Sequence, residues 1–143
     1  MPHIIKEYQI KARDFVHAGE GSIGIKNILK SLGIESNIIR RAAVCAYESE
    51  MNIVMHGGDG VLTLTVNESM IVIEVRDDGP GIGNIGLALT EGYSTALDEY
   101  REMGFGAGMG LPNIIKHSDS FAIHSLEKEG VYLRMCFWMH NKS

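Results

Sequence analysis

The 143-residue sequence contains only two cysteines, Cys45 and Cys136, and they lie in separate apolar runs. No CxxC pair and no cysteine–histidine cluster occurs, so we expect neither a disulfide framework nor a zinc site. Both thiols are predicted to be free and buried. No apolar run reaches the roughly 18 residues of a membrane-spanning helix, and the N-terminus has no signal-peptide core. We therefore expect a soluble cytoplasmic protein that does not bind membranes.

The sequence also lacks an excess of positive charge. Its 13 basic residues are outnumbered by 18 acidic residues, which gives a net charge of −5. Proteins that bind nucleic acid by neutralising phosphates are normally basic, so we expect no direct nucleic-acid partner. Apolar residues make up 45% and charged residues 22%, which is typical of globular proteins. At this length we expect one domain, spanning residues 1–143.

Hydrophobic periodicity predicts the order of helices and strands along the chain. Strands are expected over 3–11, 61–66, 70–76, 121–126 and 131–139, and helices over 22–32, 37–56 and 111–117. The strands come mostly in adjacent pairs, which favours antiparallel hairpins. The predicted fold class is therefore α+β: a two-layer α/β sandwich with a mixed, mostly antiparallel sheet and helices on one face.

The first candidate site lies on the long predicted helix. Its members are spaced by three and four residues and therefore form one stripe: Arg41, Cys45, Glu48, Asn52 and Met55. A carboxylate and an amide four residues apart suit coordination of a hard cation or proton transfer. The alternative is a solvated helix face on which the two side chains hydrogen-bond. The opposite stripe is expected to pack on the sheet: Ile39, Ala43, Ala46 and Val54.

A second candidate site directly follows the strand predicted over 70–76. The run Asp77-Asp78-Gly79-Pro80-Gly81-Ile82 contains the pattern D-x-G-x-G. Glycines let the backbone turn and let a flat ligand approach closely, and an aspartate can accept a hydrogen bond from an amino group. The alternative is an ordinary acidic turn after a strand.

The third candidate site is a glycine-rich run that precedes the helix predicted over 111–117. Gly104, Gly106, Gly108 and Gly110 alternate with other residues just before Leu111. Free N–H groups at a helix N-terminus bind anions, and glycines leave space for phosphate oxygens. The spacing fits neither the P-loop nor the Rossmann pattern. The alternative is a flexible linker, although linkers are usually richer in polar residues.

The order of these three features resembles the GHKL ATPase superfamily of gyrase, Hsp90, histidine kinases and MutL. The resemblance covers residues 36–136 and implies a Bergerat-type ATP-binding fold. Within the superfamily, the stretch from Glu91 to Thr95 and the run Gly106 to Pro112 are most similar to bacterial anti-sigma factors and switch-type serine/threonine kinases. Those proteins act in partner-switching pathways.

The resemblance implies a role for each matched residue. Glu48 would be the general base, and Asn52 would bind the nucleotide and hold Mg²⁺. Asp77 would bind the adenine amino group, and residues 83–107 would form a lid over ATP. The remaining residues implied to contact the nucleotide are Gly79, Gly81, Ile82, Gly106, Gly108, Gly110 and Leu111.

The resemblance also implies an activity and its partners. The expected activity is ATP-dependent phosphorylation of a serine or threonine on a small STAS-domain protein. A sigma factor or a phosphatase regulator is a further candidate partner, and a homodimer stays open. The alternative function is an anti-sigma factor that sequesters a sigma factor with little or no kinase turnover. A split histidine kinase is expected least, because no helical hairpin with a phospho-accepting histidine precedes Ser36.

Overall fold

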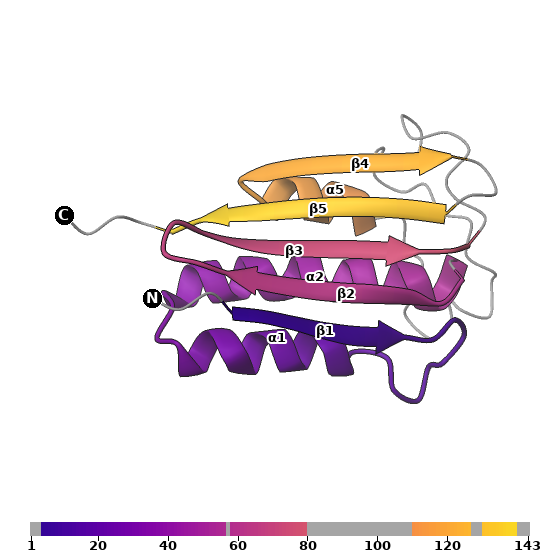
Figure 1. The fold of residues 1–143 in the computed structure, drawn as a ribbon, viewed down its shortest axis with the longest axis horizontal. Coiled ribbons are helices and arrows are strands. Elements are labelled where there is room, and N and C mark those ends of the chain that lie inside the picture. The colour runs from indigo at the N-terminus through magenta and orange to yellow at the C-terminus, as the bar shows by residue number, and fades with distance from the viewer. Residues whose placement is uncertain (1–3, 57, 80–109, 127–129, 140–143) are drawn as a thin grey trace.

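The computed structural model describes residues 4–56, 58–79, 110–126 and 130–139 (Figure 1). Its elements in chain order are β1 (Ile4–Ile10), α1 (Glu20–Ser31), α2 (Ser36–His56), β2 (Gly60–Val66), β3 (Met70–Asp77), α5 (Gly110–His117), β4 (Ser120–Leu126) and β5 (Gly130–Trp138). Every predicted strand is present, and the predicted helices are present with boundaries shifted by two residues or fewer. Within this part of the chain, no helix is long and apolar enough to cross a membrane.

The described strands form a five-stranded sheet in the order β1-β2-β3-β5-β4. The four neighbouring pairs are all antiparallel. Two of these pairs are the predicted hairpins, β2–β3 and β4–β5. The β2–β3 turn is closed by Asn67, whose side-chain oxygen accepts hydrogen bonds from the backbone N–H groups of Ser69 and Met70 at 2.9 Å. This use of an asparagine side chain is typical of tight turns.

The helices cover one face of the sheet, with α2 in the middle between α1 and α5 (Figure 1). Alternate strand residues point into this layer, because successive side chains of a strand face opposite ways. Leu64, Ile73 and Met135 are directly paired across β2, β3 and β5, and all three are fully buried. Several residues paired on the other face are partly exposed and polar, for example Thr63 and Glu74, whereas Val72 and Cys136 on that face are buried. The structure confirms the predicted two-layer α+β sandwich.

Two expectations about the packing of α2 need correction. Ile39, Ala46 and Val54 belong to the core as predicted, but Ala43 is half-buried and lines a groove between α1 and α2. The solvated-face alternative for the other stripe is also wrong, since Cys45 is fully buried. The helix is buried on several sides because α1 and α5 flank it as well as the sheet.

Candidate active site

Three of the predicted site segments meet at one edge of the molecule. The C-terminal half of α2, the end of β3 and the start of α5 lie together at this edge (Figure 1). The arrangement follows from topology: α5 runs antiparallel to α2, and β3 points to the same end as α2. Side chains that are far apart in the sequence are therefore brought together by the order of the elements.

Glu48 is half-buried on α2 and faces α5. Its Oε1 accepts a long hydrogen bond of 3.4 Å from the side-chain amide of Asn113, in the first turns of α5. Burial raises the pKa of the Glu48 carboxyl above its usual value, while the Asn113 hydrogen bond and the nearby His117 partly offset this rise. A carboxylate with a raised pKa accepts a proton more readily near neutral pH, which suits a general base.

Asn52 lies one helical turn after Glu48 on the same side of α2. Its side chain is half-buried, and within the described residues it makes no hydrogen bond. An amide oxygen at this position can act as a hard ligand for a divalent cation or bind a phosphate-bound water. The predicted hydrogen bond between Glu48 and Asn52 is not formed among these residues; Glu48 pairs with Asn113 instead.

Two further residues of the α2 stripe, Arg41 and Cys45, form hydrogen bonds with α5. Arg41 donates a hydrogen bond of 3.0 Å from Nη1 to the carbonyl of His117, at the C-terminal end of α5. Cys45 donates from Sγ to the carbonyl of Ile114 at 3.5 Å. A cation at a helix C-terminus complements the helix dipole. These contacts fix the position of α5 on α2 and hence the placement of Asn113 beside Glu48.

Asp77 is half-buried at the end of β3, where the chain leaves the sheet. Its Oδ1 accepts a hydrogen bond of 2.8 Å from the backbone N–H of Gly79. Burial raises the pKa of the Asp77 carboxyl, and backbone hydrogen bonds from Gly79 and Gly58 act in the opposite direction. A carboxylate has about four acceptor sites, so the bonds that orient it in the turn leave capacity to accept from a ligand donor.

Glycines make this turn possible. A Cβ on Gly58 would collide with the carboxylate of Asp78, and it would lie 2.9 Å from the backbone nitrogen of Gly79. Gly130 has φ +93, and a Cβ there would collide with the carbonyl oxygen of Asp77. Two separate segments therefore approach the end of β3 at backbone distance, which larger residues would prevent. Neither Gly58 nor Gly130 was predicted as part of the site.

The third predicted feature is described only from Gly110 onward. Gly110 is the first residue of α5, as the glycine run predicted. The side chain of Leu111 is 5% exposed and belongs to the core, so only its backbone is available to a ligand. Gly81, Ile82, Gly106, Gly108 and the lid predicted over 83–107 lie outside the described residues.

Sequence reasoning missed two polar residues near the site. Asn113 was not singled out, because its contact with Glu48 depends on how α5 packs on α2. Glu50 was not singled out at all, yet it is 1% exposed and accepts hydrogen bonds from the backbone N–H groups of Gly19, Gly21 and Ser22. A carboxylate that accepts three hydrogen bonds from N–H groups at a helix N-terminus caps that helix. Here the Glu50 carboxylate on α2 caps α1 and so connects the two helices.

These features define a class of protein: an α+β ATPase domain of the histidine-kinase type. The family model for histidine kinase-, DNA gyrase B- and HSP90-like ATPases matches residues 36–140. The chain therefore belongs to this ATPase family, as the order of its motifs predicted. The residues before Ser36 add β1 to the edge of the same sheet and α1 to the same helical layer.

Several known proteins are similar to this chain. The serine/threonine-protein kinase RsbT of Bacillus subtilis is 26% identical over 118 residues, which are 80% of this chain and 83% of RsbT. The anti-sigma F factor of a Thermoanaerobacter species is 31% identical over 93 residues, 62% of each chain. The mycobacterial sensor histidine kinase MprB superposes with a TM-score of 0.53 at 10% identity, over 95% of this chain and 98% of that chain, which shows a shared fold.

Proposed function

We propose that this protein is an ATP-dependent protein serine/threonine kinase that regulates a partner in a partner-switching pathway. The observation that carries the proposal is the placement of a half-buried Glu48, whose pKa is raised by burial, one helical turn from a half-buried Asn52 that makes no hydrogen bond to the described residues. The family is one of ATPases, and relatives named as a serine/threonine kinase and an anti-sigma factor support this direction. We also propose that residues 1–143 form a single ATPase domain.

We propose that the nucleotide lies at the edge where α2, β3 and α5 meet. Asp77 would accept a hydrogen bond from the adenine amino group, because a half-buried carboxylate at the end of β3 has acceptor sites beyond the one that bonds Gly79. The N–H groups at the start of α5 would face the phosphates, since a helix N-terminus favours anions. Asn52 and the phosphates would hold Mg²⁺, which when bound neutralises charge on the triphosphate. The remaining proposed contacts come from Gly79, Gly81, Ile82, Gly106, Gly108, Gly110 and Leu111.

Glu48 is the proposed general base. It would take the proton from the hydroxyl of the acceptor serine or threonine while that oxygen bonds to the γ-phosphorus. The bond between the γ-phosphorus and the bridging oxygen breaks, and ADP leaves with that oxygen. Asn113 would hold the Glu48 carboxylate in place through its amide. The acceptor that we propose is a small STAS-domain protein, as in pathways of the anti-sigma type.

Transfer of labelled phosphate from ATP to purified STAS-domain proteins tests this function. Glu48→Gln keeps the shape of the side chain but removes the base, so ATP binding should survive while transfer falls by roughly 10² or more. Asn52→Ala should instead weaken ATP binding in calorimetry. The control is Glu20→Gln, which changes an exposed glutamate on α1 and should leave both measurements unchanged. Normal transfer by Glu48→Gln would show that another group is the base.

An alternative function is sequestration of a sigma factor, which the relatives named as anti-sigma F factors favour. In that case the protein would capture its partner stably in the presence of ATP, and turnover would be slow or absent. The two functions differ in one measurement on the Glu48→Gln protein. A sequestering protein should still capture its partner and fail to release it, whereas a kinase should lose transfer without gaining a stable complex.

A further inference from the structure

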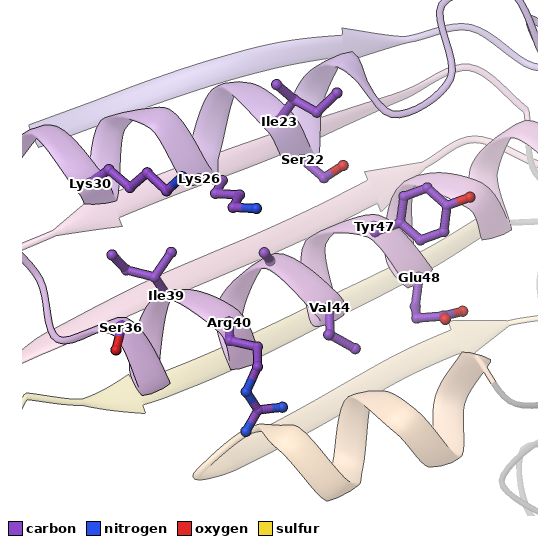
Figure 2. A pocket seen from close by; sticks show the side chains of 11 residues that line it. Ser22, Ile23, Lys26, Lys30, Ser36, Ile39, Arg40, Val44, Tyr47 and Glu48 are labelled. Atoms are coloured by element: carbon purple, nitrogen blue, oxygen red, sulfur yellow. The ribbon is translucent and has the colours of Figure 1, made fainter.

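A groove of about 580 Å³ lies on the helical layer between α1 and α2 (Figure 2). The two helices form an antiparallel pair, so the groove follows their length. Lys30 and Ser36 lie at one end, and Ser22 and Tyr47 lie at the other (Figure 2). Five of its eleven lining residues have aliphatic or aromatic side chains: Ile23, Ile39, Ala43, Val44 and Tyr47.

Two large apolar residues of the groove lining are exposed to solvent. Ile23 is 59% exposed and Tyr47 is 42% exposed, although both are large and apolar. Exposed apolar residues that gather in one concave surface are typical of protein-binding sites. A valley between two helices is a shape that accepts a third helix, which inserts side chains from one face.

The charge around the groove is positive, in contrast to the chain as a whole. Lys26, Lys30 and Arg40 line it and are exposed, while the protein carries a net charge of −5. None of the three cations forms an ion pair with a residue in the described part of the chain. Such cations attract an acidic ligand and repel a basic one, which contributes more to specificity and association rate than to affinity.

The turn of α2 that carries the proposed catalytic base also lines the groove. Glu48 lines it together with Tyr47, at the end opposite Lys30 (Figure 2). The Glu48 carboxylate itself points from α2 toward α5, so a protein segment in the groove would end near this turn of α2 and not beside the carboxylate (Figure 2). Holding an acceptor protein close to this turn lowers the entropic cost of bringing one of its hydroxyls to the base.

We propose that this groove is the docking site for the protein substrate, and that its occupant is an amphipathic helix with an apolar face and acidic flanks. The identity of the occupant as substrate depends on the proposed kinase function, but docking itself does not. The apolar lining favours such a helix over a nucleic acid or a lipid headgroup, because those ligands present phosphates and need mainly polar partners.

Fluorescence anisotropy with a synthetic peptide tests docking directly. The probe is a fluorescein-labelled peptide of roughly 18 residues, long enough to be helical, with leucines at i, i+3, i+4 and i+7 and glutamates on the flanks. The wild-type protein should bind it, and Lys26→Glu and Arg40→Glu should each weaken binding roughly fivefold through charge reversal. Ile23→Ser should weaken binding similarly through the apolar lining. Lys11→Glu, an exposed lysine outside the groove, is the matched control and should bind as the wild type does.

A second peptide and a vesicle assay complete the test. The same peptide with lysines in place of glutamates should not bind. Absence of binding by the acidic peptide, or equal binding by the Lys26→Glu, Arg40→Glu and Lys11→Glu proteins, would overturn the proposal. Flotation with phosphatidylglycerol vesicles tests whether the groove binds a lipid surface instead of a peptide. Vesicle binding that depends on Lys26 and Arg40, without peptide binding, would also overturn the proposal.

Kinetics with an acceptor protein separate this proposal from the kinase function. Lys26→Glu should raise the KM for the acceptor severalfold and leave the KM for ATP unchanged, because the groove does not include Asp77 or Asn52. Peptide binding without any phosphoryl transfer would leave the docking groove standing and would refute the kinase. Transfer that is unaffected by Lys26→Glu would instead refute the role of the groove in substrate docking.

Discussion

Glu50 should be one of the most important single residues for the stability of this protein. Its carboxylate is almost fully buried and accepts hydrogen bonds from three backbone N–H groups, those of Gly19 and Gly21 at 3.1 Å and Ser22 at 3.0 Å. These groups open α1 and have no partner within a helix, so Glu50 supplies from α2 what a local capping residue supplies elsewhere. The residue that precedes α1 is Gly19, which has no side chain with which to cap the helix.

The cost of losing this carboxylate follows from its contacts. Glu50→Ala would leave three buried donors without an acceptor, at about 1–3 kcal/mol each before water or relaxation compensates. We expect a net loss of about 4 kcal/mol in the free energy of unfolding, comparable to breaking a buried charge pair. Glu50→Gln keeps one acceptor oxygen but loses the negative charge, and should cost about 2 kcal/mol. Either loss is large beside the 5–15 kcal/mol total typical of a domain.

Equilibrium unfolding in urea, followed by circular dichroism, measures these values. Glu20 provides the matched control, because it lies in the first turn of the same helix but is exposed. Glu20→Gln should change the free energy of unfolding by no more than about 0.5 kcal/mol. Hydrogen exchange should also show faster exchange of α1 in the Glu50 variants. A Glu50→Gln protein as stable as Glu20→Gln would refute the idea that the buried carboxylate holds α1.

Three further predictions concern ionisation and specificity. Burial raises the pKa of Glu48 in the folded protein, so its stabilising contribution is complete below the pKa of the unfolded chain and is lost as pH rises through the folded value. Glu48→Gln should therefore raise the melting temperature of the nucleotide-free protein at pH 8 more than at pH 4; an equal change at both would contradict the raised pKa. Burial raises the pKa of Cys45 to about 12, so its thiol should react with Ellman's reagent only as fast as the protein unfolds; rapid reaction of the folded Cys136→Ser protein would contradict this. Asp77→Asn should reduce the preference for ATP over GTP about tenfold in calorimetry, because the guanine carbonyl cannot donate to a carboxylate; an unchanged preference would place adenine elsewhere.

Periodicity along the chain was sufficient to predict the local structure. The alternation of apolar residues in β2, and the spacing of three and four in α2, depend on backbone geometry alone. Asn67 likewise marks its turn, because its side chain bonds residues only two and three positions ahead. Adjacent hairpins then made an antiparallel sheet with helices on one face the expected architecture. The order of the motifs was specific enough to indicate the ATPase family.

Contacts between distant segments were not predictable in this way. The placement of β5 between β3 and β4, the packing of α5 against Cys45, and the pairing of Glu48 with Asn113 all join residues far apart in the sequence. The same holds for Glu50, whose spacing on α2 gives no sign that it caps α1. The sequence alone therefore determined the helices, the strands and the residue types of the site. Tertiary packing decided which carboxylates are buried and what they contact, because burial and hydrogen bonding depend on the neighbours that the fold brings into place.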